Sequence, residues 1–403
     1  MTVWDDVVGQ PEAVATLTAA AGAAAAIVAG SPTRPGAMTH AWLFTGPPGS
    51  GRSVAARAFA AALECANGGD GDCAQCRTVR AGTHADVHVV VPSGLSIAVK
   101  EMREIVLTAA RQPLGGRWHV LLIEDADRLT ERAANALLKA IEEPPARTVF
   151  LLCAPSSHPD DIPVTVRSRC RVVPVRTPPP DAVADVLVRR DGSDPELARW
   201  AARAAQGHVG RARWLARDAD ARERRAAVLA IPASLTRLDR CLAAADQLVR
   251  ASEEEAAARS ALLDEPEREA LAQSLGAGMT RGHASGPRAS ARPSAVPRGG
   301  AGAMKDLETR QKSRATRTQR DALDRALVDL AAFFRDVLVR QSGADVEPAH
   351  PDSAGDVARI AERLSPTQAL TRLRVILACR DALEQNVKPR IAVEALTASL
   401  RLP

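Results

Sequence analysis

Short β-type runs alternate with helix-like patterns along roughly the first 175 residues of the chain. The runs are rich in Val, Leu and Ile, and the segments between them repeat apolar residues at helical spacing. This alternation is typical of a parallel α/β sheet, because each helix carries the chain back to the start of a parallel neighbour. The strand candidates are residues 41–45, 87–91, 119–123, 148–153 and 171–175.

Two of the intervening segments have apolar residues at positions i, i+3, i+4 and i+7, which places them on one face of a helix. The second segment has Thr130 in position to cap its start. It must end by Pro144, because proline lacks the amide hydrogen and clashes with the preceding turn. The two apolar faces consist of Met102, Ile105, Val106 and Ala109, and of Ala134, Leu137, Leu138 and Ile141.

The strand signal fades after the Thr-Pro-Pro-Pro run at residues 177–180. Short Ala- and Arg-rich helical patterns follow, and from residue 235 onward the ordered segments all have helical spacing. Residues 276–302 are rich in Gly, Ala, Ser, Pro and Arg, a composition that favours a flexible linker. We predict an α/β domain at 1–177, a small helical domain at 178–228, and an all-α domain at 229–403 with a linker at about 276–303.

Composition and charge narrow the function classes. Apolar residues make up 46% of the 403 and charged residues 25%, an ordinary globular balance that excludes wholesale disorder. Aromatic residues are only 2%, with no Tyr, which argues against stacking platforms for single-stranded nucleic acid. The net charge is +5; residues 276–302 and 304–320 each carry about +4, so the rest of the chain carries about −3. We interpret these as a solvated linker and helix face, with contact to DNA phosphates as the alternative.

Cysteine usage and the N-terminus point to a reducing compartment. Seven Cys scattered over a long chain favour reduced thiols or metal ligation over a disulfide framework. The start of the chain is acidic at Trp4-Asp5-Asp6, unlike a secretory signal, and the apolar run 13–30 is mostly alanine. We therefore expect a cytoplasmic protein with no membrane contact, in which the 13–30 run is a helix of the folded domain.

The strongest chemical signal is Gly-Pro-Pro-Gly-Ser-Gly-Arg-Ser at 46–53, directly after a predicted strand and opening a helix. Glycines let backbone amides cradle phosphate oxygens, and the Ser hydroxyl is placed to hold Mg²⁺. Arg52 stands where the motif has Lys, and a planar guanidinium does not replace a compact ammonium. A nucleotide site and an inherited loop that no longer works with nucleotide both remain open. The candidate residues are Gly46, Gly49, Gly51, Arg52 and Ser53.

A second signal is the apolar strand 119–123, which ends in Glu124 and Asp125. Carboxylates after a buried strand are where a Mg²⁺-organising acid and a water-activating acid lie in nucleotide hydrolases. The strand follows the phosphate loop at a spacing that suits one nucleotide domain. Glu124 and Asp125 therefore join the candidate cofactor-binding residues.

Three further motifs carry a family resemblance: Val8-Gly9-Gln10, the Asn-Ala-Leu-Leu-Lys-Ala-Ile-Glu-Glu-Pro-Pro run at 135–145, and Ser168-Arg169-Cys170. With the phosphate loop, they resemble the clamp-loader branch of the AAA+ ATPases over about residues 1–215. The resemblance implies an AAA+ domain, a helical lid and a helical collar. It also implies a hetero-oligomer whose motor subunits use ATP and Mg²⁺ to place a sliding clamp on primed DNA. Arg169 would be an arginine finger that acts in trans on a neighbour's γ-phosphate.

Four departures from the ATP-hydrolysing members indicate a weak or inactive site. Besides Arg52, the acid pair Glu124-Asp125 is reversed, Cys153-Ala154-Pro155 replaces a polar sensor, and Gly210 stands where a second-sensor arginine is expected, with Arg211 one place late. The expectation is a non-catalytic subunit that lends its finger. An ATP-hydrolysing motor subunit is the alternative within the family, and a freestanding zinc-containing nucleic-acid-binding protein is the alternative from another class.

Cys65, Cys73 and Cys76 form the remaining constellation. Members of the family carry a four-cysteine zinc module here, which places a zinc-type insertion at about 65–84. One cysteine is missing from this chain, and tetrahedral zinc needs four ligands. Asp70 or Asp72 can supply the fourth as an oxygen ligand. A zinc site and free thiols are both retained as interpretations.

Overall fold

The computed structural model describes residues 2–92, 94–110, 112–115, 117–274 and 300–402. The chain forms two compact units, residues 1–219 (unit 1) and 220–403 (unit 2). Most of the predicted linker, residues 275–299, lies outside the described residues.

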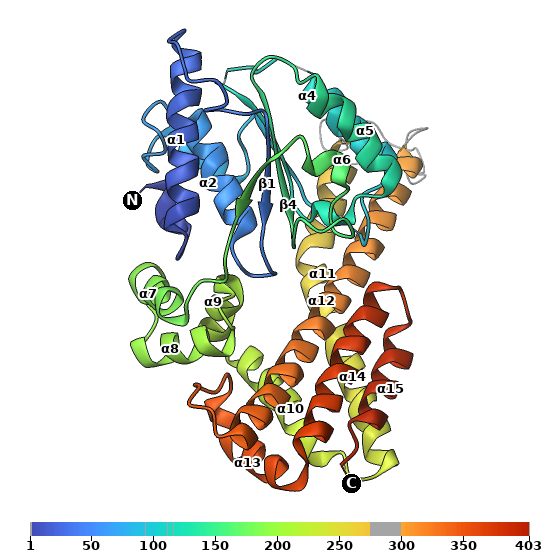
Figure 1. Cartoon of the computed structure of the whole chain (residues 1–403). Helices are drawn as coiled ribbons and strands as arrows, with labels where there is room; N and C mark the ends of the chain where they lie inside the picture. The colour runs from blue at the N-terminus through green and yellow to red at the C-terminus, as the bar shows by residue number, and fades with distance from the viewer. Residues whose placement is uncertain (1, 93, 111, 116, 275–299, 403) are drawn as a thin grey trace, which may run out of the picture. The chain divides into compact units, whose positions relative to one another are not determined.

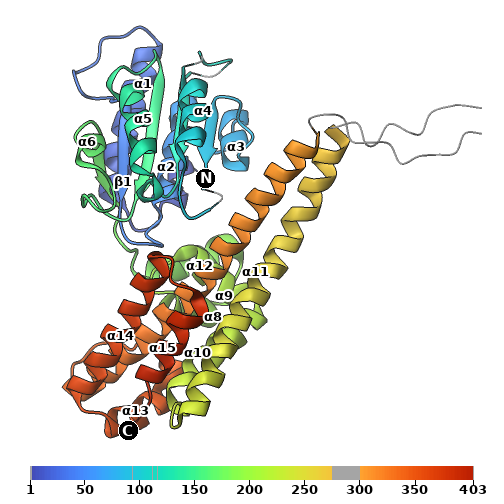
Figure 2. The same cartoon turned by 90° about the vertical axis from the view of Figure 1, so that its right-hand side faces the viewer.

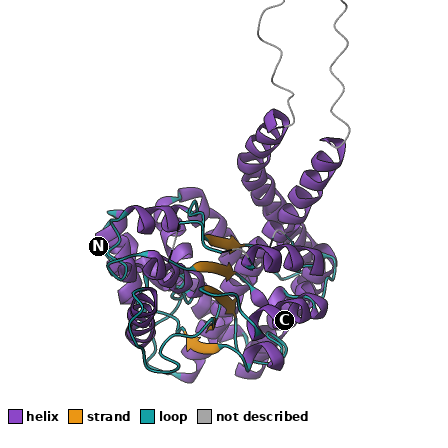
Figure 3. Cartoon of the chain, turned by 90° about the horizontal axis from the view of Figure 1, so that it is seen from above, coloured by secondary structure: helices purple, strands orange, loops and turns teal. Residues whose placement is uncertain are grey.

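Unit 1 contains a five-stranded sheet in the order β2-β3-β4-β1-β5, with every pairing parallel. Figure 3 shows these strands together with helices on both sides. The predicted α/β class with a parallel sheet is confirmed, and the predicted strands are correct to within one residue at each end. The strands are β1 (Ala41–Thr45), β2 (Val87–Val90), β3 (His119–Ile123), β4 (Thr148–Ala154) and β5 (Arg171–Pro174).

Helices cover both faces of the sheet, as Figure 1 shows: α1 and α2 on one face and α4, α5 and α6 on the other. Successive side chains of a strand point to opposite faces, so Trp42 and Phe44 join one apolar cluster and Leu43 joins the other. A sheet buried on both faces explains the nearly continuous apolar strands. The elements around the sheet are η1 (Val3–Asp6), α1 (Pro11–Val28), α2 (Arg52–Glu64), α3 (Ala74–Ala81), α4 (Val99–Ala109), η2 (Ala126–Arg128), α5 (Glu131–Glu142) and α6 (Val164–Arg167).

Helix α1 contains the apolar run of the sequence. By length and composition alone it is apolar enough to cross a membrane. In unit 1, Ala13, Leu17, Ala20 and Ala24 on this helix are buried in the apolar cluster that also holds Trp42. One face of α1 therefore packs as part of the folded domain, as predicted.

The start and the end of helix α5 are set by local sequence. Thr130 accepts a hydrogen bond from the backbone N–H of Ala133 (3.3 Å), the expected N-cap. Ala134, Leu137 and Ile141 are buried against the sheet, and the helix ends at Glu142, before the predicted proline stop.

The helices that follow the sheet belong to the same compact unit. They are α7 (Pro180–Asp191), α8 (Pro195–Ala204) and α9 (Val209–Arg217). They sit against the phosphate loop: a Cβ at Gly49 would lie 2.6 Å from the His208 side chain, and Arg190 pairs with Asp6. The predicted boundary at residue 228 falls inside a single helix, α10 (Ala219–Ser234).

The regular elements in the described part of unit 2 are all helices, and its apolar cluster includes the edge-to-face pair Phe333 and Phe334. Its two longest helices, α11 and α12, lie side by side and extend past the other helices of the unit (Figure 2). The elements after α10 are α11 (Leu238–Ser274), α12 (Gly300–Ser342), η3 (Pro351–Ser353), α13 (Ala354–Arg363), α14 (Pro366–Glu384) and α15 (Pro389–Ser399).

The basic stretch 304–320 lies on α12 and is partly neutralised by acids within unit 2. Arg314 pairs with Asp264 (2.5 Å) and Glu267 (2.7 Å) of α11, and Arg317 pairs with Asp321 (3.8 Å). These pairs use charge that would otherwise be offered to phosphates. They favour the interpretation of the stretch as a helix face.

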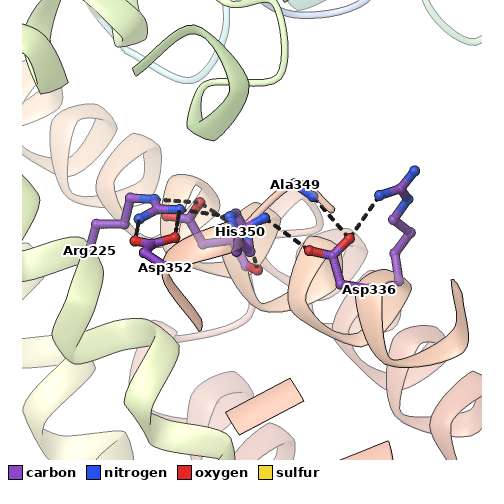
Figure 4. Close-up of polar contacts among 7 residues, drawn as sticks. Arg225, Asp336, Ala349, His350 and Asp352 are labelled. Carbon is purple, nitrogen blue, oxygen red and sulfur yellow. Dashed lines mark hydrogen bonds and ion pairs between the residues drawn. The ribbon is translucent and has the colours of Figure 1, made fainter. Parts of the chain in front are cut away.

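A buried ionic network joins α10, α12 and the segment before η3 (Figure 4). Arg225, only 4% exposed, donates to Asp352 (2.6 Å) and to Nδ1 of His350 (2.7 Å). It also faces Asp329 at 3.9 Å. Burial, followed by the charge of Arg225, lowers the pKa of His350, so this imidazole is neutral and accepts at Nδ1.

Asp336 completes the network on α12. It is buried and accepts from the backbone N–H groups of Ala349 (3.0 Å) and His350 (2.9 Å), as Figure 4 shows. It also pairs with Arg335 (2.8 Å). The network therefore fastens the segment between α12 and α13 through its own backbone.

Candidate functional site

The loop predicted to bind phosphate, residues 46–53, lies at the carboxyl end of β1. The backbone N–H of Gly46 donates to the carbonyls of Ala154 (3.3 Å) and Pro155 (3.1 Å), so the loop leaves the sheet next to β4. Ligands of open α/β sheets bind in the crevice at this edge. Gly49, Gly51, Arg52 and Ser53 line a cavity of about 310 Å³ there, together with residues of η1, α7 and α9.

Two glycines of the loop are required by the backbone and its neighbours. Gly51 has φ +95° and forms the N-cap of α2, a left-handed conformation that favours glycine. Gly49 has φ +87°, and the His208 side chain lies against it. The loop therefore keeps its glycine conformations, but the ring of His208, the N-cap residue of α9, lies against one side of it.

Arg52 turns back onto the loop. Its Nη1 donates to the carbonyl oxygen of Gly46 (2.9 Å). A lysine at this position of the motif extends toward the β- and γ-phosphates. The guanidinium here is instead bound to the backbone of its own loop, which supports the expectation that the loop is altered in function.

Glu124, the acid predicted to organise a metal ion, forms an ion pair. Arg57 of α2 donates from Nη2 (2.8 Å) and Nε (3.2 Å) to the same oxygen of Glu124, whose side chain is 17% exposed. Asp125 has φ +52° and faces Arg128 at 4.0 Å. Neither Glu124 nor Asp125 lines the cavity. A divalent ion at Glu124 would have to compete with a guanidinium held by two hydrogen bonds.

Cys153 and Gly210 are the residues that the resemblance assigns to the two sensor positions. Cys153 is buried, and burial raises the pKa of its thiol to about 12, so it remains a protonated, weak donor at neutral pH. Gly210 lines the cavity and carries no side chain. Arg211 lies outside the lining and is buried.

Arg169 lies apart from the cavity, just after α6, with its side chain 38% exposed. Its Nη2 pairs with Glu142 at the end of α5 (2.6 Å). Its Nη1 donates to the carbonyl of Thr165 (2.8 Å) and to the hydroxyl of Ser168 (3.2 Å). The guanidinium is thus held at the surface and does not line the cavity beside the predicted phosphate loop.

The predicted metal ligands come together at the other end of α2. The ligand atoms of Cys65, Asp70, Cys73 and Cys76 all lie within 4.8 Å of one another. The sulfurs of Cys65 and Cys73 are 3.7 Å apart, and Cys76 Sγ is 3.6 Å from Asp70 Oδ1. Ligands at normal zinc bond lengths in a tetrahedron stand roughly 3.6–3.8 Å apart, so the cluster fits zinc. Asp72 is not in the cluster, and its N–H instead donates to Asp70 (3.2 Å).

Hydrogen bonds favour the anionic forms of two of these ligands. Burial raises the pKa of Cys65, but N–H donors of residues 67, 69 and 70 and the Cys73 thiol outweigh it and lower the pKa overall. The side-chain amide of Asn67 and the N–H of Cys73 lower the pKa of Asp70. Burial instead raises the pKa of Cys76. A thiolate and a carboxylate are the charged ligands that a divalent cation needs.

The sequence analysis missed three contributors to these sites: Arg57, His208 and Glu142. Arg57 follows Ser53 by four residues, which puts both on one helix face, so spacing could have indicated it. His208 and Glu142 act through tertiary contacts that no spacing predicts.

Comparisons with known proteins agree with the resemblance found in the sequence. Residues 30–179 match the family described as DNA polymerase III, delta subunit. The chain is 34% identical to DNA polymerase III subunit delta' of Bacillus subtilis over 41% of this chain and 50% of that protein. It is 40% identical to subunit delta' of Pseudomonas aeruginosa over 36% and 45%. It is also 32% identical to subunit tau/gamma of Haemophilus influenzae over 43% and 26%.

The chain spans about half or less of the length of these relatives. Within that span, the chain is similar to the delta' and tau/gamma subunits of DNA polymerase III, in agreement with the resemblance. Among solved structures, the chain is similar to a DNA polymerase III gamma subunit-related protein of Thermotoga maritima. The TM-score is 0.39 at 14% identity, over 95% of this chain and 98% of that one.

Proposed function

We propose that this chain is a delta-prime-type subunit of the DNA polymerase III clamp loader and that it hydrolyses no ATP itself. It acts in the cytoplasm within a hetero-oligomer of motor and delta subunits, which places the sliding clamp on primed DNA during replication. Arg169 serves a neighbouring motor subunit in trans. The chain is thus a part of a DNA-directed DNA polymerase holoenzyme, a nucleotidyltransferase, without being catalytic alone.

The observation that carries the proposal is the Arg57–Glu124 ion pair. Hydrolysis of a nucleoside triphosphate needs Mg²⁺ to neutralise charge on the β- and γ-phosphates. Glu124 is instead bound to Arg57 (2.8 Å), and Arg52 is bound to the Gly46 carbonyl (2.9 Å). Neither side chain is therefore free to hold Mg²⁺ or to contact the phosphates. ATP and Mg²⁺ then belong to the partner motor subunits.

One second function has support of its own. The matches to gamma and tau subunits favour a motor subunit as the alternative, because their identity of about one third is similar to that of the delta' matches. The freestanding zinc protein has less support, since the matches fall on replication subunits.

ATP turnover by the purified chain separates the two functions. We expect no turnover above a buffer control, with or without primed DNA, and no gain from Arg57→Ala, because Arg52 and Cys153 remain. Arg103→Ala, also an arginine-to-alanine change on a unit 1 helix, controls for loss of surface charge. Turnover by the unmodified chain that Arg52→Ala abolishes would establish the motor function and overturn the proposal.

We also infer that Cys65, Asp70, Cys73 and Cys76 hold a structural zinc ion, which would link the end of α2 to α3. A zinc ion would account for a carboxylate, Asp70, among three cysteine sulfurs. Asp70 Oδ1 also accepts a hydrogen bond from the N–H of Cys73 (3.2 Å), which orients it toward the cluster.

Removing the oxygen ligand should weaken zinc binding. Asp70→Ala is expected to lower zinc affinity by about ten- to a hundredfold, since three ligands remain and a water must take the fourth place. Asp72→Ala is the matched control and should keep the affinity. Zinc content after dialysis against a graded chelator measures both. Equal retention in Asp70→Ala and the unmodified chain would exclude Asp70, and no zinc in any of the three would exclude the site.

A further inference from the structure

The environment of Arg169 holds its guanidinium in one orientation. Nη1 donates to two acceptors, the Thr165 carbonyl and the Ser168 hydroxyl, and Nη2 is 2.6 Å from Glu142. The contacts to Thr165 and Ser168 are local, four and one residues away. The contact to Glu142 comes from another helix, so it is the one that fixes the side chain relative to the rest of unit 1.

These contacts leave donors for another molecule. A guanidinium has five N–H groups in a planar fork. Among the described residues, none accepts a hydrogen bond from Nε of Arg169. The side chain as a whole is 38% exposed, and Nε is the guanidinium nitrogen without a contact among the described residues.

Neither the helix dipole nor core packing favours a carboxylate at position 142. Glu142 is the last residue of α5, where the helix dipole disfavours an anion. Its side chain is 46% exposed, so it supports no core packing. Glu143, the next residue, is also exposed, but the ion pair of Arg169 is with Glu142.

We propose that Glu142 is the positioning residue for Arg169: it holds the guanidinium so that its Nε edge is presented to the phosphoryl group in the neighbouring subunit. This rests on the proposed trans role of Arg169. A positioned arginine loses less rotamer freedom when it meets the phosphate, and the benefit appears in the transition state, where the charge to be stabilised is greatest. The stability of unit 1 is unaffected, since an exposed ion pair contributes little to folding.

Steady-state ATP hydrolysis by the reconstituted complex with primed DNA tests this proposal. Glu142→Ala is expected to lower the kcat contributed by the neighbouring site about tenfold. KM for ATP and the assembly of the complex, followed by sedimentation, should be unchanged. Glu143→Ala is the matched control and should leave kcat unchanged. In an Arg169→Ala background, Glu142→Ala should have no further effect, because there is nothing left to position.

The outcomes distinguish the positioning role of Glu142 from the trans role of Arg169 on which it rests. If Arg169→Ala lowers kcat and Glu142→Ala does not, Glu142 has no positioning role while the trans finger stands. If Glu142→Ala lowers kcat equally with and without Arg169, its effect does not pass through Arg169, and the proposal is wrong. If Arg169→Ala leaves kcat unchanged, the proposed trans role itself fails.

Discussion

Replacement of Arg169 by alanine is expected to lower ATP hydrolysis at the neighbouring motor site by about a thousandfold, with the complex still assembled. An arginine finger stabilises charge on the transferring phosphoryl group and typically contributes ~10³–10⁵ in rate. Arg169 is partly exposed and does not line this chain's own cavity, so under the proposed trans role we expect its loss to affect the partner's site. Single-turnover hydrolysis in the reconstituted complex, with the other motor sites inactivated, measures the effect directly.

Arg167→Ala provides the matched control. Arg167 ends α6 two residues earlier, is also exposed, and donates to the Ser157 carbonyl (3.1 Å) within its own segment. It should leave the rate within twofold or so of the unmodified complex, as surface changes usually have small effects. A similar loss in both variants would mean that α6 acts as a charged surface, and the finger at Arg169 would be rejected.

The sheet of unit 1 was predictable because its strands are short, apolar and separated by helices with clear caps. Thr130 and Pro144 marked the limits of α5 by local chemistry, which acts within one or two turns and can be identified from sequence alone. The domain boundary was harder. Residue 228 lies within α10, and helical spacing contains no information about which core a helix joins.

Some residues of the candidate sites could likewise be predicted from local sequence, and others could not. Gly49 and Gly51 of the loop line one cavity, and the three predicted cysteines cluster with Asp70, as the sequence patterns led us to expect. The partners that decide what the sites can do come from elsewhere in the fold. Arg57 reaches Glu124 across 67 residues of sequence, and Glu142 reaches Arg169 across 27. Such pairs depend on how helices pack against strand ends, which neither composition nor periodicity determines.

Replacement of Arg225 by alanine is expected to destabilise unit 2 by about 3–5 kcal/mol, the usual effect of removing one partner from a buried ionic group. The guanidinium is the cation shared by Asp352, Asp329 and the Nδ1 acceptor of His350. Without it, the carboxylate of Asp329 remains buried next to a neutral imidazole, and its desolvation is no longer compensated.

Two spectroscopic signals separate this effect from a general loss of stability. All five Trp lie in unit 1, so Trp fluorescence reports that unit, whereas circular dichroism at 222 nm also reports the helices of unit 2. In urea, Arg225→Ala should shift the circular-dichroism transition to lower concentration and leave the fluorescence transition in place. Arg240→Ala, an exposed arginine on α11, should shift neither. A shift below about 1 kcal/mol in Arg225→Ala would mean that water replaces the guanidinium and that the network does not hold unit 2 together.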